Sequence, residues 1–512
     1  MNIKWIKPIY AKYFFVSFIS GLLIHLYMIT NKLPLADDIA FSPMKTNGCS
    51  LSSGRWFLDY YNLSSGWNIP IIRGFLALLF GSLAVVLLIN LWNIESKLAV
   101  LLFAFSFWAF PFNASVFTQM YMADVYYCGI FLAIVGCFLF IKYRNILSLI
   151  IASTCFACAT GIYQSLILFA IMCLLCTFLL YTVSRQDCFF SLIREGLEMC
   201  FALVCGIILY KVILNEELVR NNVELTDYQG INNAGSISIS SLLTGIKTAY
   251  YDYFLFLFSN KAYGFNTRLN VSINAIIVLM SIFFLVCLLS NTKNISNSIF
   301  SAFCVLIWPI AINFIYIMAP SANIYSLQKL QYVFLILFFI AVVELFSHIY
   351  SFDNTKKSYM NYFVIFVITI NIFSGFLTVN KIYYKLQLNF YSTYAYYVEL
   401  ISNLKSEDAF DYEKPIIFVG TPSENINMHD TSIIDEISGF GWNFDNQDLI
   451  RRPAYGQVFC DTYLGLHTST LNQDELTALY NSLEYKTANS YPYNGFAFEY
   501  NDKLIIKLGD YE

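Results

Sequence analysis

The chain has 512 residues, of which 58% are hydrophobic and only 12% are charged. Soluble globular proteins are about 25% charged, so this composition, with a mean hydropathy of +0.59, excludes that class and predicts a polytopic membrane protein. The formal net charge is −4 and no basic tract occurs, so the sequence gives no sign of a nucleic-acid partner.

Apolar runs of about 20 residues, the length that crosses a bilayer, recur along the first three quarters of the chain. They begin near Tyr13, Pro70, Leu98, Asp124, Ile146, Ile162, Leu197, Val271, Ile299, Leu330 and Tyr359. The first run has no small-residue cleavage site, so it is expected to be a span and not a signal peptide. The sequence therefore predicts a mostly α-helical membrane bundle of about eleven spans in residues 1–380.

Basic residues in short loops predict the orientation, because they favour the cytoplasmic side. With the N-terminus inside, the cytoplasmic set comprises Lys4, Lys7, Lys12, Lys97, Lys142, Arg144, Arg185, Arg194, Lys293, Lys356 and Lys357. Lys32, Lys45 and Arg55 fall on the opposite side and reduce the difference in basic residues between the two sides. An odd number of spans then exports everything after about Lys381.

Two long exported loops are expected inside the membrane domain, at residues 31–68 and 215–270. The cytoplasmic loops are short, so nearly all of the polar sequence lies on the exported side. A protein of this design acts on the outer face of its membrane. ATP and nucleotide sugars are cytoplasmic and are thereby excluded as direct substrates.

Residues 381–512 read as a small exported α/β domain. The expected elements are a helix over 389–405, a strand over 414–420 and a helix over 472–483 that Asn472 can cap. Residues 495–509, "GFAFEYNDKLIIKLG", alternate apolar and polar side chains on both sides of Asn501-Asp502, which predicts a β-hairpin.

The first exported loop opens with two adjacent carboxylates, Asp37 and Asp38. As caps of a short helix they would contribute up to about 1 kcal/mol. As a catalytic pair, one would deprotonate an acceptor hydroxyl while its neighbour raises the pKa of that base or holds it in place. Composition alone does not rank the two alternatives.

Further along the same loop, "SSGRWFLDYY" places Arg55, Trp56, Asp59 and Tyr60 at helical spacing. One side of this helix is aromatic and the other charged, which suits the headgroup plane. Arg55 can pair with Asp59 one turn away, or present its guanidinium to a lipid phosphate.

Asp124 stands at the mouth of a span, where an ionisable residue is a functional candidate; the alternative is a helix N-cap. Tyr163 and Gln164 join two spans and are either substrate contacts or polar residues of a tight interhelical turn.

Three short motifs carry a family resemblance. The first-loop "DD" followed by "SGRW", then "TQMYMAD" and "GIYQS", resemble the bacterial Gtr type II glucosyltransferases, which are serotype-converting enzymes that decorate O-antigen. The resemblance covers residues 10–380. It implies a fold of the GT-C kind and a polyprenyl-phosphate sugar donor, with a first-loop acid as catalytic base. Carried onto this sequence, the catalytic positions are Asp37, Asp38 and Asp124, and the substrate positions are Arg55, at the donor phosphate, with Trp56, Gln119, Tyr163 and Gln164.

The resemblance also implies transfer of a hexose, glucose by family, to a lipopolysaccharide O-antigen or related surface glycan. The enzyme would lie in the bacterial inner membrane with a cytoplasmic N-terminus and a periplasmic tail. It would depend functionally on a flippase and a donor synthase. No cofactor is implied, and the four histidines, His25, His348, His429 and His467, show no metal-ligand spacing.

Three other functions stay open. An O-antigen polymerase or ligase would also be polytopic with large exported loops, although repeated Arg-rich loops are absent here. A transporter would place ionisable groups in mid-span and show paired interrupted helices. A non-enzymatic envelope scaffold is the third.

Overall fold

The computed structural model describes residues 8–40, 49–65, 69–185, 189–226, 238–259, 267–292, 294–320, 324–350, 354–422, 450 and 452–510. The chain forms two compact units. The membrane unit comprises Met1–Asn31 and Pro43–Asn380, and the tail unit comprises Lys32–Ser42 and Lys381–Glu512. The segment Lys32–Ser42, expected in an exported loop of the membrane domain, thus packs with the tail.

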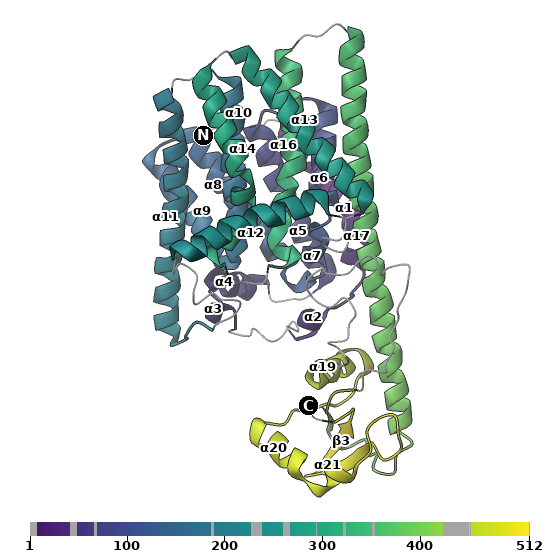
Figure 1. Cartoon of the computed structure of the whole chain (residues 1–512). Coiled ribbons are helices and arrows are strands. Elements are labelled where there is room, and N and C mark those ends of the chain that lie inside the picture. Colours follow the sequence, from purple (N-terminus) through teal and green to yellow (C-terminus); the bar gives the residue numbers. More distant parts are fainter. Residues whose placement is uncertain are drawn as a thin grey trace. The chain divides into compact units, whose positions relative to one another are not determined.

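The regular secondary structure in the described residues of the membrane unit is all helical (Figure 1). Its elements are α1 (Pro8–Thr30), α3 (Cys49–Ser52), α4 (Trp56–Ser65), α5 (Pro70–Leu91), α6 (Lys97–Ala109), α7 (Asn113–Phe117), η1 (Met120–Met122), α8 (Ala123–Tyr143), α9 (Ile146–Ile162), η2 (Gln164–Leu166), α10 (Ile167–Ser184), α11 (Phe189–Asn221), α12 (Ile239–Phe258), α13 (Arg268–Thr292), α14 (Ile295–Ile312), α15 (Ile315–Met318), η4 (Ser326–Val333), α16 (Phe334–Ile349) and the first part of α17 (Asn354–Leu404). The elements named η are 3₁₀ turns.

Nine helical segments of the described chain are long and apolar enough to cross a membrane, which confirms a mostly α polytopic membrane protein. All eleven predicted runs are helical, but α6 and α9 have only 13 and 17 residues and fall short of a span. Pro111 explains the end of α6, because a proline pushes the preceding residue out of the helical region. Phe110 is accordingly extended, with φ −64° and ψ 125°.

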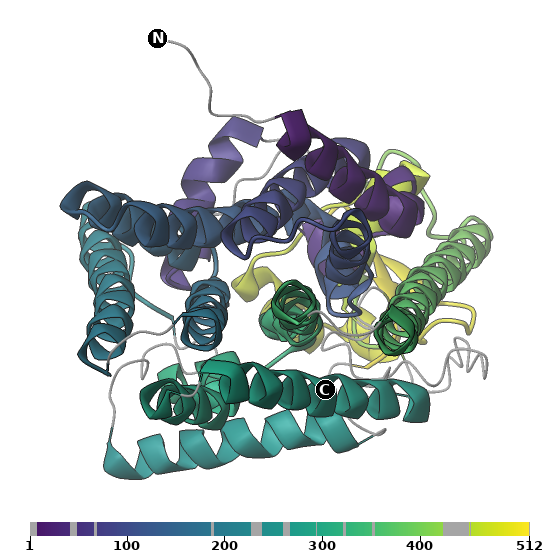
Figure 2. The ribbon, with the colours of Figure 1, turned by 90° about the horizontal axis from the view of Figure 1, so that it is seen from above.

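Helix α12 lies inside the loop 215–270 that was expected to lack a span. Ser238 and Ser241 form a capping box that starts it. The helix is seen along its length both in Figure 1 and from above in Figure 2, whereas α16 is viewed down its axis in Figure 2. The axis of α12 therefore crosses the direction of the α16 axis and is not parallel to it.

Small residues let α1, α5 and α6 approach one another around Trp108, which is fully buried. The indole Nε1 of Trp108 donates to Ser17 Oγ at 3.0 Å. A Cβ added at Gly81 would lie 2.3 Å from Trp108 Cη2, so only glycine fits there. Close backbone approach with a few interhelical hydrogen bonds is how membrane helices associate, since lipid supplies no hydrophobic drive between them.

The tail unit contains a three-stranded sheet of order β1-β3-β2, with β1 (Ile416–Val419), β2 (Ala497–Tyr500) and β3 (Lys503–Lys507). Strand β1 pairs in parallel with β3, and β2 pairs with β3 in antiparallel register. The predicted hairpin is confirmed: Asn501 and Asp502 have φ of 49° and 60°, the left-handed pair of a type I′ turn.

The described part of the tail unit also contains helices α2 (Ala36–Ala40), α19 (Pro453–Leu464), α20 (Gln473–Asn481) and α21 (Leu483–Thr487). The predicted cap of α20 is confirmed, because Asn472 Oδ1 accepts from Glu475 N at 2.8 Å. The helix expected at 389–405 is the end of α17, since no glycine or proline separates it from the preceding span.

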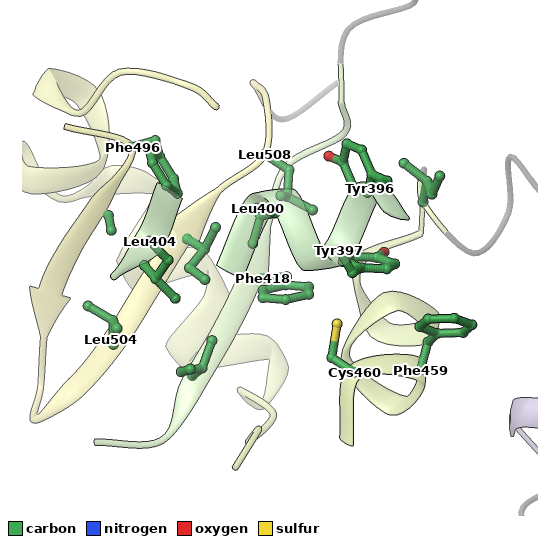
Figure 3. Packing of buried hydrophobic residues seen from close by; sticks show 14 of the residues in the cluster. Tyr396, Tyr397, Leu400, Leu404, Phe418, Phe459, Cys460, Phe496, Leu504 and Leu508 are labelled. Atoms are coloured by element: carbon green, nitrogen blue, oxygen red, sulfur yellow. The ribbon is translucent and has the colours of Figure 1, made fainter. Parts of the chain in front are cut away.

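The core of the tail unit packs one face of the sheet against α17 and α19. Tyr397 and Leu400 of α17, Phe418 of β1, Phe459 of α19 and Leu504 of β3 meet there (Figure 3). The rings of Tyr397 and Phe418 stack with centroids 5.8 Å apart. The unit therefore has a hydrophobic core of its own.

We predict that Gly420→Ala unfolds the edge of this sheet. Gly420 has φ +76°, and an added Cβ would lie 1.9 Å from the carbonyl oxygen of Gly509. Gly465→Ala is the matched control, because Gly465 has φ +66° with nothing within 4 Å of the added Cβ. The left-handed backbone alone costs about 1–2 kcal/mol, and the overlap adds about 1–3 kcal/mol.

The measurement is the rate at which a protease cleaves residues 381–510 in the full-length protein. Gly420→Ala should be cleaved much faster than Gly465→Ala. Equal rates for the two variants would show that the backbone angle matters and the close approach does not.

Candidate functional site

The turn between α3 and α4 is fixed from two neighbouring helices of the membrane unit. Gln164 Nε2 donates to the carbonyl oxygen of Ser53 at 2.8 Å, and the Tyr210 hydroxyl donates to that of Gly54 at 2.9 Å. Gly54 has φ +78°, and an added Cβ would lie 2.8 Å from Gln164 Nε2. The turn therefore requires glycine, and it holds the next residue, Arg55, in a defined place.

Arg55 lies against an aromatic pair at the start of α4. Its guanidinium carbon is 4.6 Å from the centroid of the Tyr163 ring, within cation–π range. The Tyr163 ring in turn lies 5.1 Å from that of Tyr126 on α8. The structure thus brings together three residues that the sequence proposed for substrate binding: Arg55, Tyr163 and Gln164.

Trp56, also proposed for substrate binding, is buried in a packing cluster. It lies with Leu51, Ala157, Tyr210 and Leu214. An added Cβ at Gly161 would be 2.6 Å from Trp56 Cε2, so the indole packs directly on the backbone of α9. In this position Trp56 anchors α4 to α9 and α11.

Asp124, at the start of α8, is fully buried in an ion pair with Arg73. Arg73 Nη1 lies 2.8 and 2.9 Å from its two carboxylate oxygens. The Tyr61 hydroxyl donates to Oδ2 at 2.9 Å. Sequence reasoning missed Arg73, although an arginine three residues into an apolar run is an unusual position that marks it for attention.

Helix α4 connects Arg55 with the buried ion pair of Asp124 and Arg73. Arg55 immediately precedes it and Tyr61 lies within it, six residues later, about 9 Å along a helix axis. Burial, followed by the charge and hydrogen bond of Asp124, raises the pKa of the Tyr61 hydroxyl, so Tyr61 acts there as a donor. Arg73 on α5 and Arg55 just before α4 are therefore both held next to the short helix α4.

Gln119 is buried in the connection between α7 and η1. Its backbone N donates to the Val116 carbonyl, and its own carbonyl accepts from Met122 N, both at 3.0 Å. It lies just before Asp124 in the turn that leads into α8.

A second buried ion pair occurs where no prediction placed one. Lys329 of η4 donates to both carboxylate oxygens of Asp252 on α12, at 2.8 and 2.9 Å, and the Tyr332 hydroxyl donates to the same carboxylate at 3.1 Å. The pair joins the transverse helix α12 to the 3₁₀ entrance of α16. Its sequence signal is a lone lysine directly before an apolar run, at "SLQKLQYV".

The two adjacent carboxylates of the first loop lie in α2 of the tail unit. Asp38 is buried, and its Oδ2 accepts from Leu35 N at 3.1 Å, which is the N3 half of a capping box. Asp38 therefore makes a capping contact at the start of α2. Asp37, next to it, is half-buried. Burial and then the charge of Asp38 raise the pKa of the Tyr463 hydroxyl.

Comparison with known proteins identifies one family. Residues 26–336, more than half of the chain, match the family described as Glucosyl transferase GtrII. The matched region contains every predicted site residue and both buried ion pairs. No curated protein and no solved structure matches the chain.

We predict that removing only one partner of the buried Arg73–Asp124 ion pair destabilises the membrane unit more than removing both partners. Arg73→Met leaves Asp124 as an uncompensated buried charge, which costs about 3–5 kcal/mol. The double change Arg73→Met with Asp124→Leu leaves no charge and should recover most of the lost protein. Abundance in membranes and the unfolding temperature in detergent measure this, and a single variant as abundant as the parent would contradict it.

Proposed function

Because the chain belongs to the Glucosyl transferase GtrII family, we propose that it transfers a hexose, glucose by the family's description, from a polyprenyl-phosphate donor to a surface glycan. The chain is a membrane-embedded glycosyltransferase. The acceptor that we propose is lipopolysaccharide O-antigen or a related glycan, on the outer face of the bacterial inner membrane. A flippase and a donor synthase would supply the sugar.

The observation that carries the donor proposal is the placement of Arg55. Its turn is fixed by Gln164 and Tyr210, and its guanidinium lies on the ring of Tyr163. A guanidinium makes paired hydrogen bonds to a phosphate that a lysine cannot reproduce. A lipid-linked donor brings such a phosphate to the membrane surface and needs no nucleotide-binding domain.

In this mechanism the acceptor hydroxyl loses its proton to a general base and attacks the anomeric carbon. The bond from that carbon to the donor phosphate breaks, and the polyprenyl phosphate leaves with the electron pair. Arg55 stabilises the negative charge that develops on the leaving phosphate. We propose Asp37 or Asp38 as the base.

We give Asp124 a positioning role. Both of its carboxylate oxygens already accept hydrogen bonds, from Arg73 and Tyr61. The resulting contact fixes α4, and α4 follows directly on Arg55. Gln119 and Trp56 support the same region through the turn into α8 and the packing on α9.

The function is tested by mass analysis of O-antigen from cells with and without this protein. We expect a gain of one hexose per repeat, and loss of that gain when the synthase of the polyprenyl-phosphate sugar is deleted. A gain that survives this deletion would refute the donor but not the transfer. A changed chain length with an unchanged repeat would favour the polymerase alternative.

The base is tested by Asp37→Asn and Asp38→Asn in the same assay. The amide oxygen of asparagine at position 38 can still accept the hydrogen bond from Leu35 N but takes up no proton at neutral pH, so the change separates catalysis from folding. General-base catalysis contributes about 10²–10⁴-fold, so one variant should lose nearly all transfer at parent-like abundance.

Asp59→Asn is the matched control in the same predicted exported loop. The Asp59 carboxylate accepts a hydrogen bond from Ser50, and burial raises its pKa, so a neutral amide suits its site. This control should retain activity. Full activity of both Asp37→Asn and Asp38→Asn would restrict the pair to capping.

A further inference from the structure

A groove of about 460 Å³ lies between α6, α16 and α17 in the membrane unit. Aliphatic side chains line most of it, among them Leu98, Ile340 and Ile365, while Glu95, Glu344 and His348 line its polar end. Its volume falls within the roughly 300–1,000 Å³ of small-molecule sites. An apolar channel with a charged end has the polarity profile of a single lipid molecule.

The polar end is built around a buried carboxylate. Glu344 is 7% exposed, and its Oε1 accepts from Ser96 N at 2.7 Å and Glu95 N at 3.2 Å. It therefore caps the start of α6, where the partial positive charge of the helix favours an anion. Glu95 adds a second, exposed carboxylate. His348 Nε2 lies 3.5 Å from Glu344 Oε1.

The groove is separate from the proposed donor site. Arg73 lies near the start of α5, and the groove begins just beyond the end of that helix at Leu91. The 18 residues between them span about 27 Å of helix axis. The basic residues of the sequence predict that this end of the bundle faces the cytoplasm.

We propose that the groove binds a phospholipid whose headgroup carries a primary amine. One acyl chain lies along the aliphatic wall, and the ammonium lies against the carboxylates of Glu95 and Glu344. A headgroup with only negative charge is disfavoured there, because two carboxylates repel it. Leu98 is 44% exposed, so the wall of the groove is accessible from the lipid side.

Native mass spectrometry of the full-length protein in detergent tests this with added phosphatidylethanolamine, phosphatidylglycerol and phosphatidylcholine. We expect one phosphatidylethanolamine to be retained in preference to the other two lipids. Glu95→Gln removes one charge partner of the ammonium and should weaken that retention roughly 5-fold, the worth of one solvent-exposed ion pair.

Leu98→Trp fills the groove and should abolish the retained lipid. Leu101→Trp is the matched control, since Leu101 is on the same helix, is 41% exposed and does not line the groove. Equal lipid retention by the two tryptophan variants would overturn the groove as the site. Equal binding of the three lipids, with no effect of Glu95→Gln, would overturn the amine headgroup.

Discussion

The buried ion pair between Arg73 and Asp124 is the contact on which the candidate site depends. A charge in an apolar bundle is tolerated only when it is paired and its remaining hydrogen bonds are satisfied. Asp124 meets this requirement with Arg73 from α5 and Tyr61 from α4. The energetic need to neutralise one carboxylate thus positions a short surface helix, and that helix follows directly on Arg55. The buried ion pair between Asp252 and Lys329 joins α12 and η4 in the same way.

Tyrosine side chains supply several of these polar contacts, and the chain has 38 tyrosines. A tyrosine fills apolar space with its ring and still supplies a hydroxyl donor at its tip. The hydroxyls of Tyr61 and Tyr332 each complete a buried carboxylate, and that of Tyr210 holds the Gly54 turn. The ring of Tyr163 supports the Arg55 guanidinium. Tyrosine therefore allows polar groups to be fixed inside a bundle that contains few charges.

The two units contribute differently to the family match, which covers residues 26–336. Most of the tail unit lies outside the match and has its own core of α17, α19 and sheet residues. The segment Lys32–Ser42 is the exception, because it lies inside the match but packs with the tail. Ile39, next to the two carboxylates, belongs to the tail core. The packing of the tail thus sets the local conformation of Asp37 and Asp38.

The sequence by itself determined the elements whose cause is local. Apolar runs became helices because a backbone in lipid must satisfy its own hydrogen bonds, and Asn501-Asp502 formed a hairpin because these residues tolerate left-handed angles. Only the tertiary structure decided which side chains meet. Arg73 reaches Asp124 across 51 residues, Lys329 reaches Asp252 across 77, and Gln164 reaches Ser53 across 111. Such pairs depend on the rotation and packing of whole helices, and no stretch of sequence encodes that separately.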